Sequence, residues 1–254
     1  MRLFEYAIEC KRINGSYKLA VLSDLHGSDP FACIELLKKS LPDFILAPGD
    51  IFELVDGSRE KINKMNESGF LLLSEAAKLA PTFYSMGNHE IGGTHSWAKP
   101  FGFRGKRKAV WSKGNLKRLE ESGAQLLDDS YVICGEFAIG GLSSGILERD
   151  GKPNLSFLED FASLDVPKIL LCHHPEYYEK YLLRLDVDLI VSGHAHGGQW
   201  RFFGKGVFSP GQGIFPKYTS GIYDGRLAVS RGMAKGRVIP RIFNPAEIML
   251  IKVN

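Results

Sequence analysis

Five short apolar runs that each end in metal-binding residue types constrain this chain more than any other feature of its sequence. Each run is four to six residues long, and the runs begin at positions 18, 44, 82, 168 and 189. Continuous apolar runs of this length predict strands that are buried on both faces. The runs lead directly into Asp24-Leu-His26, Gly49-Asp50, Gly87-Asn88-His89-Glu90, His173-His174-Pro175 and Gly193-His194-Ala-His196.

Helical patterns separate several of these runs. They cover residues 31–40, 59–79, 112–122, 155–163 and 176–184. The order of strand, polar loop and helix predicts an α/β fold. In such folds the functional groups gather beyond the carboxyl ends of the strands, so the five polar loops should build one site. Further short strands are expected near 3–9, 131–140, 199–203, 226–230 and 247–253. Without an internal repeat or a low-complexity linker, we predict a single domain over 1–254.

Composition excludes several other classes of protein. The 254 residues are 44% hydrophobic and 24% charged, which is typical of a globular chain rather than a disordered one. No apolar stretch follows Arg2 and Glu5, so we see no signal peptide and expect a cytoplasmic protein. Four cysteines without Cys-x-x-Cys spacing favour reduced thiols. A net charge of +3 is too small to predict a nucleic-acid partner.

The residue types at the strand ends predict a pair of metal ions. Aspartate, histidine and asparagine side chains are ligands for Mn, Fe or Zn, and we expect Mn²⁺ first. Seven such side chains are too many for one tetrahedral zinc, but they suit two ions that share a carboxylate. Two neighbouring ions clamp a phosphoryl group and lower the pKa of a bound water. The candidate ligands are Asp24, His26, Asp50, Asn88, His173, His194 and His196.

Each patch by itself also has a simpler interpretation. An aspartate after a strand is often a helix cap, and a Gly-Asp pair is often a turn. Six of the seven histidines nevertheless fall in these patches. Five patches in this order, each after a buried strand, are poorly explained by separate structural roles.

The ordered motifs resemble the calcineurin-like metallophosphoesterase superfamily. They span positions 24 to 196, about two-thirds of the chain. The string over 192–199 and the tail over 229–247 resemble its bacterial branch of YkuE-like and YaeI-like phosphodiesterases. The resemblance implies a β-sandwich of two mixed sheets flanked by helices, in α-β-β-α layers.

The resemblance also implies a role for each residue. Asp24, His26 and His196 would hold the first ion, and Asn88, His173 and His194 the second, with Asp50 between them. A metal-bridging hydroxide would attack phosphorus, and His89 would protonate the leaving group. Glu90 is expected to orient His89, and His174 to lie beside the ligands without binding metal. The implied activity is that of a phosphodiesterase with two divalent ions per chain.

Two alternatives remain for the function. Gly49-Asp50-Ile-Phe-Glu53 resembles hydrolases that split UDP-diacylglucosamine, so a pyrophosphatase on a nucleotide-linked lipid or sugar is the first. Those hydrolases lack the Gly-His-x-His-Gly-Gly-Gln string. The second is a metallophosphoesterase fold that is kept as a non-catalytic scaffold. The presence of all seven candidate ligands and of His89 argues against this alternative. No Asp-Arg-Gly element follows Asp50, which argues against a protein phosphatase.

A basic and aromatic stretch follows the proton-donor motif. Between Glu90 and Glu120 there are eight basic residues and no acidic one. Basic and aromatic side chains together suit a lipid phosphate or a nucleotide. We therefore hypothesise that the loop over 92–108 forms the rim of the site and contacts an anionic substrate or membrane surface. The alternative is a solvated face. The rim candidates are Trp97, Arg104, Lys106 and Arg107.

Overall fold

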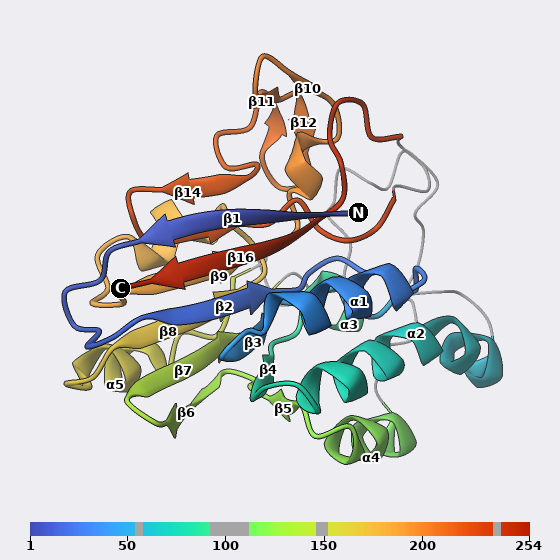
Figure 1. Cartoon of the computed structure of the whole chain (residues 1–254), viewed down its shortest axis with the longest axis horizontal. Coiled ribbons are helices and arrows are strands. Elements are labelled where there is room, and N and C mark those ends of the chain that lie inside the picture. The colour runs from blue at the N-terminus through green and yellow to red at the C-terminus, as the bar shows by residue number, and fades with distance from the viewer. Residues whose placement is uncertain (54–57, 92–111, 146–151, 236–239) are drawn as a thin grey trace.

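The computed structural model describes residues 1–53, 58–91, 112–145, 152–235 and 240–254, and it contains two six-stranded sheets (Figure 1). In the first sheet β2, β3, β4 and β5 are parallel, and β16 lies antiparallel to β2 and parallel to β1. Its order in space is β1 (Arg2–Ile8), β16 (Glu247–Val253), β2 (Tyr17–Val21), β3 (Phe44–Ala47), β4 (Thr82–Tyr84) and β5 (Gln125–Leu126).

The second sheet is also mixed. Its strands β15, β9, β8 and β7 are parallel, and β14 and β6 run antiparallel at the two edges. The order is β14 (Gly221–Tyr223), β15 (Leu227–Val229), β9 (Leu189–Ser192), β8 (Lys168–Cys172), β7 (Phe137–Leu142) and β6 (Ser130–Cys134).

The two sheets pack face to face, and helices cover both outer faces. One apolar cluster joins the facing sides of the sheets, with Val21 and Leu46 from the first sheet and Ile139, Leu171 and Val191 from the second. A second cluster packs α1 (Phe31–Ser40), α2 (Arg59–Ala77) and α4 (Lys113–Glu121) on the first sheet. A third packs α5 (Leu158–Ser163) and a π-helical turn, η3 (Tyr178–Leu182), on the second. The predicted α-β-β-α layers are confirmed.

Local sequence signals set the ends of the helices. Ser58 precedes α2 and its hydroxyl accepts a hydrogen bond from the amide of Lys61 at 3.3 Å. Ser112 caps α4 in the same way through the amide of Asn115. A serine cap satisfies one of the unpaired amides of the first helical turn. The pattern over 31–40 matches α1 at both ends.

Two expected elements differ from the structure. The strand expected over 131–140 is divided into β6 and β7, because Gly135 adopts a positive φ of 61° and turns the chain back. The helical pattern over 176–184 contains only the turn η3. Within the described parts of the chain, no helix combines the length and the apolar run needed to span a membrane.

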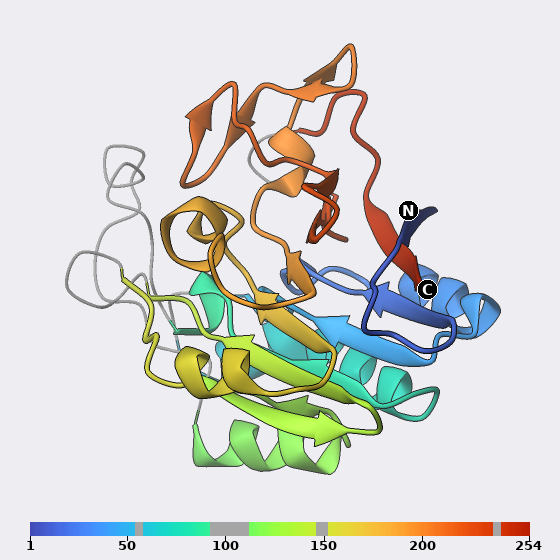
Figure 2. The same cartoon turned by 90° about the vertical axis from the view of Figure 1, so that its left-hand side faces the viewer.

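A layer of short elements follows β9. It comprises a 3₁₀ turn, η4 (His196–Gly198), and two small hairpins. The hairpins are β10 (Arg201–Phe202) with β11 (Lys205–Gly206), and β12 (Phe208–Ser209) with β13 (Gly213–Ile214). Both views place this orange layer above the two sheets (Figure 2). It therefore lies next to the end of β9, where the last predicted ligands are found.

Candidate metal centre

The predicted ligands gather at the carboxyl ends of the parallel strands of both sheets. Asp24 and His26 follow β2, Asp50 follows β3, and Asn88 begins the short helix α3 (Asn88–Ile91) after β4. From the second sheet, His173 follows β8 directly, and His194 and His196 follow β9. Because the two sheets are stacked, these strand ends lie side by side at one end of the sandwich.

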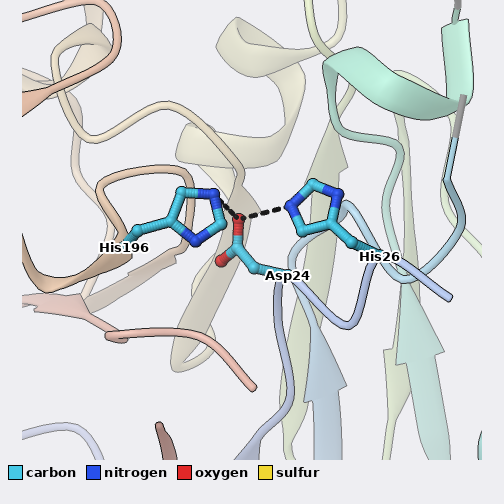
Figure 3. A group of neighbouring side chains, drawn as sticks. All are labelled: Asp24, His26 and His196. Carbon is cyan, nitrogen blue, oxygen red and sulfur yellow. Dashed lines mark ion pairs between the residues drawn. The ribbon is translucent and has the colours of Figure 1, made fainter. Parts of the chain in front are cut away.

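The first group of ligands consists of Asp24, His26 and His196. One ligand atom from each residue lies within 4.8 Å of the others. The Nε2 atoms of His26 and His196 lie 3.7 Å and 3.6 Å from Oδ1 of Asp24. Figure 3 shows this oxygen between the two rings. Asp24 is fully buried, so this charged oxygen is sheltered from solvent.

The second group of ligands consists of Asp50, His173 and His194. The Nε2 atom of His173 lies 3.1 Å from Oδ2 of Asp50, and that of His26 lies 3.7 Å from the same oxygen. The other oxygen, Oδ1, accepts a hydrogen bond of 2.9 Å from the amide of His89. One oxygen of Asp50 is therefore anchored, and the other faces both ligand groups. Asn88 is buried at the start of α3.

The rings of His26, His173 and His196 are turned so that Nε2 of each ring faces a carboxylate of the cluster. Nδ1 of His173 lies 2.8 Å from the carbonyl oxygen of Pro48, which can only accept, so Nδ1 carries the hydrogen. The Nε2 atoms of His26 and His173 are buried and make no hydrogen bond within the described part of the chain. Buried carboxylates with imidazole nitrogens of this kind fit a divalent first-row metal ion.

The backbone is strained where it delivers these side chains. Five of the predicted ligands adopt left-handed φ values between 46° and 63°: Asp24, His26, Asp50, His194 and His196. This conformation costs a non-glycine residue roughly 1–2 kcal/mol. Gly87 also lies close to Asp50, since a Cβ atom on Gly87 would lie 2.3 Å from Oδ1 of Asp50. Strain concentrated in this way is typical of functional sites.

Charges in the cluster keep the carboxylates ionised. Burial alone would raise the pKa of Asp50, but the neighbouring His173 and His89 hold it well below its usual value. Burial would lower the pKa of His173, yet Asp50 raises it to about 9. Burial, with His26 and Arg241 nearby, lowers the pKa of His196 to about 3 despite Asp24. A cation that binds here must displace the proton of His173, whereas His196 is already neutral.

Glu90, which is expected to orient His89, contacts the backbone near Asp50 through its carboxylate. Its carboxylate accepts hydrogen bonds from the amides of Asp50, Phe52 and Gly87 at 2.9–3.1 Å, so it fixes the loop that carries Asp50. The carboxylate that lies against Nδ1 of His89 is that of Glu53, whose Oε1 is 2.8 Å away. Oε2 of Glu53 lies 3.1 Å from Nδ1 of His26. The sequence places Glu53 three residues after Asp50, but that spacing alone did not identify this contact.

His174 lies beside the second ligand group. Its Nε2 is 2.6 Å from the hydroxyl of Ser144, and its Nδ1 is 3.3 Å from Oε1 of Glu176. The same oxygen of Glu176 is 4.0 Å from Nε2 of His194. Glu176 was missed by the sequence reasoning, although it follows the His-His-Pro string directly. The four candidates for the rim, Trp97, Arg104, Lys106 and Arg107, lie outside the described residues.

Comparison with known proteins identifies the family of this chain. The calcineurin-like phosphoesterase model matches residues 17–198. An uncharacterized metallophosphoesterase of Aquifex aeolicus is 24% identical over an alignment covering 100% of this chain and 92% of that protein. Phosphodiesterase YaeI of Escherichia coli is 28% identical, with 73% of this chain and 62% of YaeI aligned.

The uncharacterized metallophosphoesterase YkuE of Bacillus subtilis is also 28% identical, with 91% of this chain and 77% of YkuE aligned. Some relatives are longer, and the chain spans less than two thirds of YaeI. These similarities confirm the resemblance to the YkuE-like and YaeI-like proteins. The family match covers more than half of the chain and includes every predicted ligand. This protein therefore belongs to the calcineurin-like phosphoesterase family.

Proposed function

We propose that this protein is a phosphodiesterase that uses two divalent metal ions per chain. The observation that carries the proposal is the position of Asp50, whose Oδ2 faces His173 at 3.1 Å and His26 at 3.7 Å. Asp50 thus lies between the two ligand groups and would contribute to both. The name of the relative YaeI supports a phosphodiester as the substrate class.

The residues divide between the two ions as the family motifs imply. Asp24, His26 and His196 would hold one ion, with Asp50 shared. The other would be held by Asn88, His173 and His194. When bound, two such ions polarise a phosphoryl group and lower the pKa of a coordinated water. Mn²⁺ is the first ion to test, with Fe and Zn as alternatives.

His89 is placed to act as the proton donor. Its Nδ1 is held by Glu53 at 2.8 Å, which leaves Nε2 as the nitrogen that faces the cluster. Nε2 lies 3.9 Å from Oδ2 of Asp50, and the side chain is 25% exposed, so a leaving group can approach it. A proton on Nε2 would pass to the leaving alkoxide as the ester bond breaks.

The stoichiometry of metal binding tests the proposal. Protein saturated with Mn²⁺ and then desalted should hold close to two ions per chain by elemental analysis. It should hydrolyse bis-p-nitrophenyl phosphate, lose that activity on chelation and regain it with Mn²⁺. A firm value of one ion per chain would contradict the dinuclear site. Retention of full activity after complete chelation would contradict metal-dependent hydrolysis.

Glu53→Gln should weaken both metal binding and turnover. A glutamine side chain has a single oxygen, which can accept a hydrogen bond from only one of the two imidazoles, His26 or His89. Its NH₂ group would face the Nδ1–H group of the other imidazole. Loss of such a contact to a metal-binding histidine costs roughly 10–100-fold in metal affinity or activity. Mn²⁺ titration and the hydrolysis rate measure both effects. Glu75→Gln, which removes only the ion pairs of Glu75 with Lys78 and Lys38 at the end of α2, is the control. Unchanged values for the Glu53 variant would show that the contact has no functional role.

A further inference from the structure

Two segments near the carboxyl terminus pack against the first ligand group. The amides of Met233 and Ala234 donate to the carbonyl oxygens of Ser23 and Asp24 at 2.9 Å and 2.8 Å. The side-chain amide of Asn244 donates to the carbonyl oxygen of His196 at 2.7 Å. Both segments therefore lie directly beside Asp24 and His196, although they follow the last metal-binding motif by more than thirty residues.

Arg241 lies between these two segments and has unused hydrogen-bond donors. Its Nη2 donates to the carbonyl oxygen of Arg231 at 2.7 Å, which holds the guanidinium in place. Its Nε and Nη1 atoms are buried and have no hydrogen-bond partner in the described part of the chain. A buried donor without a partner costs about 1–3 kcal/mol, and more on a charged group. These N–H groups are therefore available to an acceptor that the described residues do not supply.

The charge of Arg241 acts on the cluster. Burial lowers the pKa of Arg241 to about 10, although the charges of Asp24 and Glu247 oppose this shift, so the guanidinium is ionised at neutral pH. Its Nη2 also lies 3.4 Å from the carbonyl oxygen of Gly232, and Gly232 packs against Asp24, since a Cβ atom on Gly232 would lie 2.9 Å from Oδ2 of Asp24. Asp24 has other partners, since it receives the amide of His194 and faces the rings of His26 and His196. A cation kept beside a metal-binding cluster is favourable when an anion binds between them.

We propose that Arg241 binds a phosphoryl oxygen of the substrate beside the metal-binding cluster. This inference rests on the proposed function, because it takes the phosphodiester group as the missing acceptor. A guanidinium presents several N–H donors in a fixed plane and forms strong charge-assisted hydrogen bonds to phosphate. One edge of Arg241 is fixed to the backbone carbonyl of Arg231. Its remaining donors would then meet the phosphoryl group without much loss of side-chain freedom.

The test is the binding of inorganic phosphate to Mn²⁺-loaded protein, measured by calorimetry. Arg241→Gln removes the charge but can still donate to the carbonyl of Arg231. Loss of a hydrogen bond to a charged group costs about 1.5–3 kcal/mol, so phosphate affinity should fall by roughly 10- to 100-fold. Arg241→Lys keeps the charge without the planar donors and should give an intermediate loss. Mn²⁺ content should remain that of the wild type.

Arg226 offers a matched control. It is also partly buried, its Nη2 donates to the carbonyl oxygen of Leu185 at 3.0 Å, and its Nε has no hydrogen-bond partner among the described residues. However, it precedes β15, at the amino ends of the parallel strands and away from the cluster. Arg226→Gln should leave phosphate affinity unchanged.

Equal phosphate affinity in wild type and Arg241→Gln would overturn the assignment. If Arg241→Gln does not fold, Arg241→Lys decides, and wild-type affinity in that variant would overturn the assignment equally. Wild-type protein that binds Mn²⁺ and phosphate but hydrolyses no diester would instead contradict the proposed function. The two failures are thus distinguishable, since phosphate binding is measured without turnover.

Discussion

Asp50→Asn should lose bound metal and activity together. The amide of asparagine keeps an oxygen that can accept from the amide of His89, so the loop should retain its shape. It removes the negative charge and places an N–H₂ group where the oxygen now faces His26 and His173. The removal of one preorganised contact costs an enzyme about 10²–10³-fold in rate, and the loss of shared metal binding should cost at least this much. Elemental analysis and hydrolysis of bis-p-nitrophenyl phosphate measure the two losses.

Asp165→Asn is the appropriate control for this variant. Asp165 is exposed in the loop before β8, at the amino ends of the parallel strands and away from the cluster. The Asp165→Asn variant should keep the metal content and the hydrolysis rate of the wild type. Two ions per chain in Asp50→Asn would rule out Asp50 as the shared ligand. The Asp50→Asn variant should remain folded, which circular dichroism can check.

His89→Ala should keep both ions and lose rate. The side chain is not among the predicted ligands, and alanine is well tolerated in the short helix α3. Loss of a general acid typically costs about 10²–10⁴-fold in rate. The loss should be largest for diesters with poorly stabilised alkoxide leaving groups. It should be smallest for p-nitrophenolate, which departs without a proton. Rates on a matched pair of aryl and alkyl diesters measure the difference.

The dependence on the leaving group distinguishes general-acid catalysis from other roles of His89. An equal loss for aryl and alkyl esters would instead indicate that His89 binds phosphate or supports the fold. Loss of metal from His89→Ala would show that the ring is a ligand, as its place in a group with His26 and Asp50 allows. Metal content must therefore be measured in the same preparation.

The grouping of the candidate ligands could be predicted because its signals are local. Each ligand directly follows a short apolar run, and glycines accompany several of them at positions where a side chain would collide. Gly193 is an example, since a Cβ atom there would lie 2.6 Å from Oδ2 of Asp24. The helices at 31–40 and 59–79 were predictable for the same reason, because apolar spacing depends on neighbours within the same segment.

The partners of the carboxylates were not predictable in this way. Glu90 is adjacent to His89 in sequence, yet its carboxylate accepts hydrogen bonds from the amides of Asp50, Phe52 and Gly87. Glu53 lies 36 positions from His89 and contacts its ring. At the start of α3 consecutive side chains point in different directions, so adjacency in sequence does not imply contact. The contact depends on how the ends of β3 and β4 lie side by side.

The sequence by itself determined which residue types stand at the ends of the buried strands, and therefore that a divalent metal centre is expected. Only the tertiary structure decided which of them share an oxygen, because Asp50 meets His26 and His173 through the stacking of two separate sheets. It also decided the place of Arg241. Strand β16 inserts between β1 and β2, so the segment that precedes it must cross the edge that carries Asp24. Such a pairing joins segments more than 200 positions apart, and no local pattern encodes it.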